Sequence, residues 1–293
     1  MYYRRKVLLA LIETFDGALK KTDCQKLLFL FCQYTNKNYY DFFPHKFGSF
    51  SYLVYQDKKR LTDLNLLSKS ENFELLKSGT FTGQLKSEEQ SVLRHLKLKF
   101  HGPLGKELIR KVYLDYPQFA CRSTVLSDIM KPAEIDQIRL AWNTDQTPTL
   151  FTIGYEGLSI DAYLHKLISN NIRALIDVRK NPISMKYGFS KTKLKYYIEN
   201  AGLKYFHIPE LGIPSVLRSN LKGPADHQRL FQYYFTQILP KQADALERLT
   251  KLHSQYTRTA LTCYEADYHS CHRYKLAEYL QDNAAFDATI VHL

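Results

Sequence analysis

The chain has 293 residues, of which 45% are hydrophobic and 24% are charged, as is typical of a globular protein. No apolar run approaches the roughly 20 residues of a membrane-spanning helix, which argues against a membrane protein. The length predicts two domains. Five cysteines, an odd number in a long chain, argue against a disulfide framework and favour the cytoplasm. Glu13 and Asp16 interrupt the apolar stretch near the N-terminus, so no signal peptide is expected.

The chain is strongly basic, with 41 Lys and Arg against 29 Asp and Glu and a net charge of +12. Residues 1–148 carry 23 basic and 16 acidic side chains, and the remainder carries 18 and 13. Such an excess favours polyanionic partners, nucleic acid above all, although a merely basic soluble protein is the plainer alternative. The 22 Tyr and 17 Phe residues, interleaved with basic ones, suit stacked bases, but most of them are expected in the core.

The first half predicts a mainly α-helical domain. Apolar spacing predicts helices over 3–16, from a cap at Thr22 onwards, and over 51–64, 87–99, 103–115 and 132–141. Residues 66–85 are expected to form a small β-ribbon. Lys58, Lys59 and Arg60 lie together on the third helix. Helices plus a ribbon with a basic stripe predict a winged-helix-like domain that binds nucleic acid through these three residues. A solvated helix face is the alternative.

Three stretches of this half, in this order, resemble the Panacea antitoxin-type domain: Lys21–Phe31, Pro44–Ser51 and Leu61–Leu67. In that family a Gln-Lys-Leu helix precedes a Tyr-Gly-Pro segment. Here Gln25-Lys26-Leu27 matches, and Phe47-Gly48-Ser49 replaces Tyr-Gly-Pro. The resemblance implies a sensing or interaction role with a protein partner, not chemistry.

The polar stretch 142–149 predicts a boundary between a basic interaction or sensing domain over 1–145 and an α/β domain over 150–293. The second half alternates regularly. Strands are expected over 150–154, 172–178, 203–208, 259–263 and 288–293, with helices over 160–169, 191–201, 231–253 and 271–282. This alternation predicts a three-layer, Rossmann-like, mostly parallel sheet.

Polar side chains follow four of these strands where each strand ends. Since ligands bind at the carboxyl ends of parallel strands, these residues are expected to share one rim. They are Tyr155 and Glu156, Asp177 and Arg179, Glu210, and Cys263, Glu265, Cys271, His272 and Arg273.

Two arginines of this rim, Arg179 and Arg273, are candidates to hold a phosphate or carboxylate. The alternative is a structural network with Asp177 or Glu265. Ser270 is expected to cap the last helix, which would place Cys271, His272 and Arg273 in a first turn that attracts anions. Tyr155 is a candidate to stack on a base, or a wall of the rim.

Three rim residues are candidate catalytic groups. Glu265 suits a general acid or base, and the alternative is a cap or an arginine partner. Cys263 suits a nucleophile, and the alternative is a small buried hydrophobe. Asp177 is the other candidate carboxylate. Cys263, Cys271 and His272 are also zinc-ligand types, but C-x7-C-H is not a standard zinc framework, so neither a metal nor a cofactor is expected.

An ordered set of motifs in the second half resembles the family catalogued as domain of unknown function 488. They are Thr152–Gly157, Ile176–Pro182, Gly188–Ser190, Gly202–Gly212, Cys263-x-Glu265, Cys271–Arg273 and Val291–Leu293. The resemblance implies an intracellular prokaryotic protein with an α/β fold, and it implies little about activity, because the family has none assigned. Asp177-Val-Arg179 and a cysteine at a strand end are also similar to rhodaneses, in which a cysteine heads a tight anion-binding loop. Here the loop from Cys263 to Arg273 is longer.

These observations favour a nucleic-acid-directed protein, with DNA and RNA both open, in prokaryotic defence or nucleic-acid processing. Its C-terminal rim is expected to bind and hydrolyse a nucleotide or base-containing substrate. One alternative is a non-enzymatic, nucleotide-sensing regulator or antitoxin-like protein that binds a protein partner. A third is a rhodanese-like thiol enzyme, which requires Cys263 to be reactive.

Overall fold

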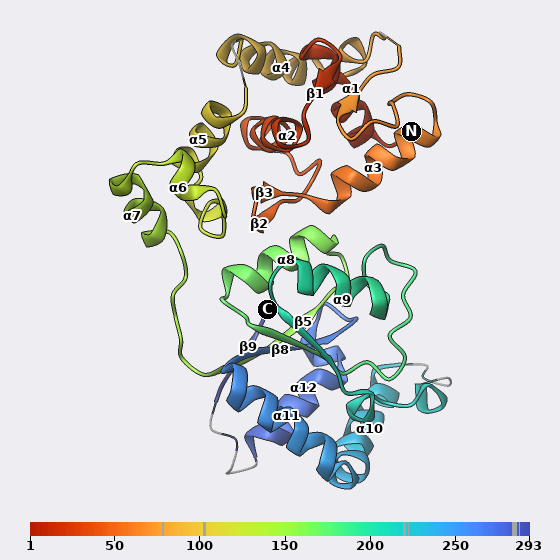
Figure 1. Ribbon diagram of the computed structural model, residues 1–293. Helices are drawn as coiled ribbons and strands as arrows, with labels where there is room; N and C mark the ends of the chain where they lie inside the picture. Colours follow the sequence, from red (N-terminus) through yellow and green to blue (C-terminus); the bar gives the residue numbers. More distant parts are fainter. Residues whose placement is uncertain (78, 102–103, 219–220, 222, 283–285, 287) are drawn as a thin grey trace. The chain divides into compact units, whose positions relative to one another are not determined.

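The computed structural model describes residues 1–77, 79–101, 104–218, 221, 223–282, 286 and 288–293. The chain forms two compact units, Met1–Trp142 and Asn143–Leu293 (Figure 1). Among the described residues, no helix is both long enough and apolar enough to cross a membrane.

The first unit is mainly helical. Its helices and strands are α1 (Tyr3–Thr14), β1 (Ala18–Leu19), α2 (Lys21–Thr35), β2 (Phe43–His45), β3 (Gly48–Phe50), α3 (Tyr52–Asp63), β4 (Phe73–Glu74), α4 (Ser87–Lys99), α5 (Lys106–Asp115), α6 (Leu126–Ile129) and α7 (Pro132–Leu140). The predicted start of α5 at residue 103 lies outside the described residues.

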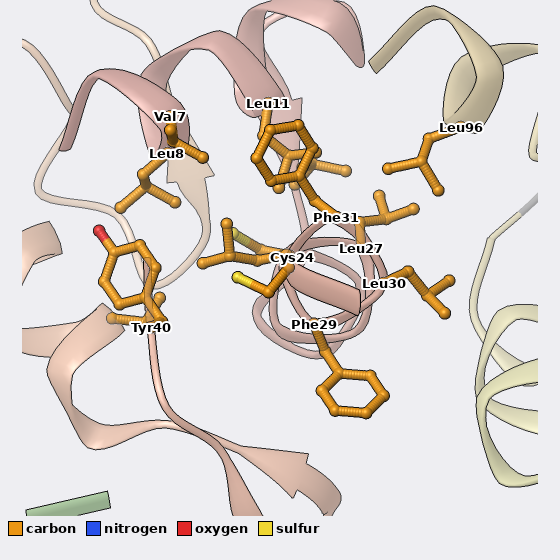
Figure 2. Packing of buried hydrophobic residues seen from close by; sticks show 14 of the residues in the cluster. Val7, Leu8, Leu11, Cys24, Leu27, Phe29, Leu30, Phe31, Tyr40 and Leu96 are labelled. Atoms are coloured by element: carbon orange, nitrogen blue, oxygen red, sulfur yellow. The ribbon is translucent and has the colours of Figure 1, made fainter. Parts of the chain in front are cut away.

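The core of the first unit surrounds α2, whose apolar residues point in several directions. Figure 2 shows Phe31 on the side of Leu11 from α1, whereas Phe29 projects from the opposite side of the helix. The Phe29 ring makes edge contacts with Phe119, with ring centroids 4.8 Å apart. A helix that is apolar nearly all round must be covered on every side, and this explains why α1, α4 and α5 all pack on α2.

Two details of the first unit differ from the sequence prediction. Thr22 is not a cap, because α2 begins at Lys21 and Lys20 occupies the cap position. The expected ribbon over 66–85 is reduced to an isolated bridge between Leu67 and Leu75, and β4 pairs instead with β1. Residue 78 of that stretch lies outside the described part. The winged-helix-like character remains a prediction.

The second unit confirms the predicted α/β architecture. Its strands are β5 (Thr149–Gly154), β6 (Ala174–Asp177), β7 (Lys204–His207), β8 (Arg258–Cys263) and β9 (Thr289–His292). Its helices are α8 (Ile160–Ser169), α9 (Lys191–Asn200), α10 (Pro224–Tyr233), α11 (Ala243–Tyr256) and α12 (His272–Gln281). The five strands form one parallel sheet in the order β7-β6-β8-β5-β9.

The strand order determines which face each helix covers. The connections from β5 to β6 and from β6 to β7 run in one direction along the sheet, and those from β7 to β8 and from β8 to β9 run in the other. Because parallel crossovers are right-handed, the two sets of helices lie on opposite faces. Figure 1 shows α8 and α9 on one side of the sheet and α11 and α12 on the other.

The prediction of one long helix over 231–253 is wrong, because the helix is interrupted in its middle. It consists of α10, a π turn over Tyr234–Ile238, a 3-10 turn over Leu239–Lys241 and then α11. Pro240 lies in the 3-10 turn, and a proline cannot donate the backbone hydrogen bond that a continuous helix requires. The apolar spacing alone conceals this break.

Candidate functional site

A cleft of about 370 Å³ lies at the carboxyl end of the central strands. Its position follows from the topology: the loop after β8 leads to one face of the sheet, and the loops after its neighbours β5 and β6 lead to the other. The lining residues are Tyr155, Arg179, Lys180, Asn181, Ile183, Ser184, Met185, Ile213, Arg218, Cys263, Tyr264, Glu265 and His272. The cleft therefore contains Tyr155, Arg179, Cys263, Glu265 and His272 from the residues predicted at the rim.

A larger hollow of about 710 Å³ lies elsewhere in the second unit, lined by residues that include His227, Phe231 and Tyr274. Among the described residues that line it there is no carboxylate and none of the predicted catalytic or binding residues. We place the candidate site in the smaller cleft, because that cleft combines carboxylate, thiol, imidazole and guanidinium groups.

One wall of the cleft is a buried ion pair between Asp177 and Arg179. The guanidinium donates to both carboxylate oxygens, with Nε–Oδ1 and Nη2–Oδ2 distances of 2.8 and 2.6 Å. Tyr205 donates a further hydrogen bond to Oδ2 at 2.7 Å. Asp177 is fully buried and does not line the cleft. This geometry favours the structural-network alternative for the pair over a catalytic role for Asp177.

Arg179 also donates hydrogen bonds to two residues besides Asp177. Its Nη1 donates to the Tyr155 hydroxyl and to the carbonyl of Phe189, both at 2.9 Å. Burial alone would lower the pKa of Arg179, but the hydrogen bonds and charge of Asp177 outweigh it and raise this pKa. Arg179 is thus a fixed positive charge at the cleft wall, with most of its donors already engaged.

Tyr155 follows β5 and is buried at the cleft wall. Its ring stacks on Phe189, with centroids 4.3 Å apart and planes within 8°. One face of the ring is therefore occupied, which favours the wall interpretation. Tyr264 is 47% exposed and also lines the cleft, so it is the better placed ring for stacking on a ligand.

The loop after β8 is held by Arg273 and by close packing on β5. Arg273 has no exposed surface and donates to the carbonyls of Glu265 at 2.6 Å and Ala266 at 3.1 Å. A Cβ on Gly154 would lie 1.7 Å from the same Glu265 carbonyl oxygen. The prediction that Arg273 holds a ligand anion therefore does not fit its surroundings: its partners are backbone oxygens of the site loop.

The floor of the cleft brings Cys263, Glu265 and His272 together. The Cys263 thiol donates to Glu265 Oε2 at 3.3 Å, and its Sγ lies 3.5 Å from His272 Nδ1. Burial alone would raise the pKa of Glu265, but hydrogen bonds from Cys271, its own backbone and Cys263 outweigh it and lower the pKa. Glu265 is therefore a carboxylate at neutral pH and suits a base better than an acid.

Cys271 and His272 begin the last helix. Cys271, not Ser270, is the residue that precedes α12, because Ser270 closes a 3-10 turn by donating to Asp267 at 2.7 Å. Burial raises the pKa of the Cys271 thiol. Burial alone would lower the pKa of His272, but the contact with Cys271 and the Glu265 carboxylate raise it. Cys271 lies behind the floor and does not line the cleft.

Sequence reasoning missed several contributors to the cleft. Lys180 and Arg218 are exposed and add two positive charges to its rim. Tyr264 stands between two residues that were selected, and its exposure could not be deduced from their spacing. Arg218 lies after the third strand, in a segment that carries no recognisable motif.

The three basic residues predicted to bind nucleic acid lie on α3 of the first unit. Lys59 and Arg60 are exposed. Lys58 donates to the carbonyls of Ser70 and Glu71, both at 2.7 Å, and its ammonium lies over the ring of Phe73. Lys58 therefore holds the segment before β4, whereas its two neighbours project from the helix surface.

Comparison with known proteins finds a match only within the second unit. No curated protein and no solved structure matches the chain. The resemblance of the first half to the Panacea domain is not shown and remains a prediction. Residues 159–280, which carry the cleft residues from Arg179 to His272, match the model of the family described as Domain of unknown function DUF488.

Proposed function

We propose that the second unit hydrolyses a nucleotide or a base-containing nucleic-acid substrate in the cleft above β8. The observation that carries the proposal is the grouping of the Glu265 carboxylate with Cys263 and His272 at the floor of a basic cleft. A carboxylate held beside polar groups in a concave site is suited to activating water.

The rim of the cleft favours an anionic substrate with a flat apolar part. Lys180 and Arg218 contribute positive charge, whereas the charge of Arg179 is balanced by Asp177, and Glu265 is the single carboxylate among the lining residues that the structure describes. Tyr264 offers a half-exposed ring, and Met185 and Ile183, which line the same cleft, are largely exposed. Positive charge beside an exposed aromatic ring matches a phosphate next to a base.

In the proposed reaction Glu265 accepts a proton from a water molecule, and the water oxygen forms a bond to the electrophilic atom of the substrate. The bond to the leaving group breaks, and the leaving group departs with the proton that Glu265 returns. Atoms and charge balance with water as the only co-reactant. The lowered pKa of Glu265 keeps this group in its carboxylate form at neutral pH.

The test is mass spectrometry of products after incubation of the full chain with DNA and RNA pools, including pools with modified bases. Glu265→Gln keeps the shape of the side chain and removes the base, so we expect product formation to fall by about 10²–10⁴-fold. Glu247→Gln is the matched control, because Glu247 pairs with Lys251 on α11 and does not line the cleft.

Equal turnover by Glu265→Gln and the unaltered chain would contradict the proposed base. Turnover of free small anions, with no effect of nucleic acid, would contradict the substrate class. Nucleic acid retained in a salt-dependent way without any product would favour the sensing alternative instead.

A further inference from the structure

Two cysteines and a histidine meet behind the floor of the cleft. Cys263 ends β8, Cys271 directly precedes α12, and His272 is the first residue of that helix. All three are buried, and their ligand atoms lie within 4.8 Å of one another. The sequence spacing gave no standard metal framework, but folding brings the three side chains together across the loop between β8 and α12.

The distances within this group fit a tetrahedral zinc ion. With Zn–S of about 2.3 Å and Zn–N of about 2.0 Å, the sulfur–nitrogen edge of a regular tetrahedron is about 3.5 Å. The Nδ1 atom of His272 lies 3.5 Å from Cys263 Sγ and 3.9 Å from Cys271 Sγ. Both sulfur–nitrogen distances are close to this edge, and the two sulfurs lie within 4.8 Å of each other.

The histidine ring is oriented as zinc ligands usually are. Its other nitrogen, Nε2, lies 3.3 Å from the carbonyl oxygen of Val178, which can only accept a hydrogen bond. The proton is therefore assigned to Nε2, and the lone pair of Nδ1 faces the two sulfurs. A backbone carbonyl that fixes the far nitrogen of the ring is a common partner of metal-binding histidines.

The fourth side of the group opens towards the cleft. Cys263 and His272 line the cleft, Cys271 closes the back, and Glu265 Oε2 lies 3.3 Å from Cys263 Sγ. Two cysteines and one histidine with an open fourth position is an arrangement found in catalytic zinc sites. Glu265 is thus the carboxylate that contacts this group from the cleft.

We propose that Cys263, Cys271 and His272 bind one zinc ion, with Glu265 beside its open position. Binding of the ion stands on the geometry alone. Its use in catalysis rests on the proposed function: zinc would hold the attacking water and lower the pKa of that water, and Glu265 would take the proton.

The first test measures metal rather than activity. The full chain is purified, analysed for metal content, and titrated with Zn²⁺ and with Co²⁺, whose absorption spectrum reports tetrahedral thiolate ligation. We expect one ion per chain, and a loss of affinity of roughly 100-fold or more in Cys271→Ala and His272→Ala. Cys121→Ala is the matched control, because Cys121 lies in the first unit and is not part of the group.

A second measurement uses no variant, so it still tests the proposal if the variants fail to fold. In the unaltered protein, Zn²⁺ should slow alkylation of Cys263 and Cys271, which peptide mass spectrometry reads site by site. Binding weaker than micromolar, an affinity unchanged in Cys271→Ala, or a disulfide between Cys263 and Cys271 in the native protein would overturn the proposal.

The experiments distinguish failure of the proposed hydrolase from failure of the proposed zinc site. One bound zinc ion per chain with no product from any nucleic-acid pool would reject the hydrolase and keep the metal site. Turnover that depends on Glu265 but is unaffected by full removal of metal would reject a catalytic zinc and keep the hydrolase.

Discussion

Lys26 is a charged residue placed inside the core of the first unit. It is 1% exposed, and its ammonium donates to the backbone carbonyls of Phe47 and Ser49. Burial lowers its pKa from 10.5 to about 7. Between these two values the unfolded chain binds a proton that the folded chain does not, so unfolding is favoured by acid. The resulting loss in the free energy of unfolding is complete below about pH 7 and disappears as the pH approaches 10.5.

We therefore expect the free energy of unfolding to rise with pH between 7.5 and 9.5, by up to about 1.4 kcal/mol per pH unit from this residue. Lys26→Met should remove that slope. Urea unfolding of both chains at several pH values measures it, and only the difference in slope matters, because the variant also leaves two carbonyls without their donor. Parallel profiles would show that the two carbonyls keep the ammonium charged in the folded state.

At the residue scale, the sequence identified the polar groups of the site but not their partners. Asp177 and Arg179 are two residues apart at a strand end, which suits a ligand site and an internal ion pair equally well. The folded distances select the ion pair. The sequence predicts that Arg273 holds an anion or pairs with a carboxylate, yet it donates to backbone carbonyls. Backbone oxygens cannot be recognised from residue types.

At the element scale, the end of β5 and the loop after β8 are in direct backbone contact at Gly154. A Cβ there would lie 1.7 Å from the carbonyl oxygen of Glu265 and 2.5 Å from its carbonyl carbon. Gly154→Ala must therefore displace the loop that carries Glu265. Overpacking of this kind costs about 1–3 kcal/mol, and here it also moves the base of the proposed reaction.

We expect Gly154→Ala to lower the unfolding free energy of the second unit by about 2 kcal/mol and to lose product formation as severely as Glu265→Gln. Denaturant unfolding and the product assay measure the two effects. Gly83→Ala is the control, because a Cβ on Gly83 meets no atom within 4 Å. Full activity in Gly154→Ala would show that the loop can shift without moving the carboxylate.

The strands and helices themselves were predicted well where a buried element carries a regular pattern of apolar residues. β8 and α8 are examples, since every residue of β8 is buried and α8 has one apolar face. The apolar pattern gave the wrong result where backbone hydrogen bonding determines how a helix begins or where it is interrupted. Pro240 breaks the helix expected over 231–253, and Ser270 serves a short turn instead of capping α12. Both depend on local hydrogen bonds that apolar spacing does not encode.

At the scale of the whole molecule, the parallel sheet was predictable but its strand order was not. Alternation of strands and helices fixes a layered architecture, whereas the position of β8 between β5 and β6 depends on pairing across more than 80 residues. That position creates the cleft, because it places Cys263 between the ends of two neighbouring strands. The grouping of Cys263, Cys271 and His272 follows from the same arrangement, and its C-x7-C-H spacing is set by the loop rather than by a known framework.

The net charge of +12 raises the question of where a nucleic acid would bind. If α3 of the first unit is the contact, Lys59 and Arg60 must carry it, since Lys58 is engaged by Ser70 and Glu71. Each phosphate contact adds about 0.9 to the slope of log K against log salt concentration for duplex DNA. We expect Lys59→Ala/Arg60→Ala to weaken binding and to reduce that slope by about 2.

Fluorescence anisotropy over a range of salt concentrations measures both quantities. Lys106→Ala/Lys131→Ala is the matched control, because it removes two exposed positive charges of the same unit from other segments. A slope that falls equally in both variants would show that binding depends on the summed charge of the chain. A slope that falls only in the α3 variant assigns the contact to that helix, because screening by salt is the same for two proteins of equal net charge.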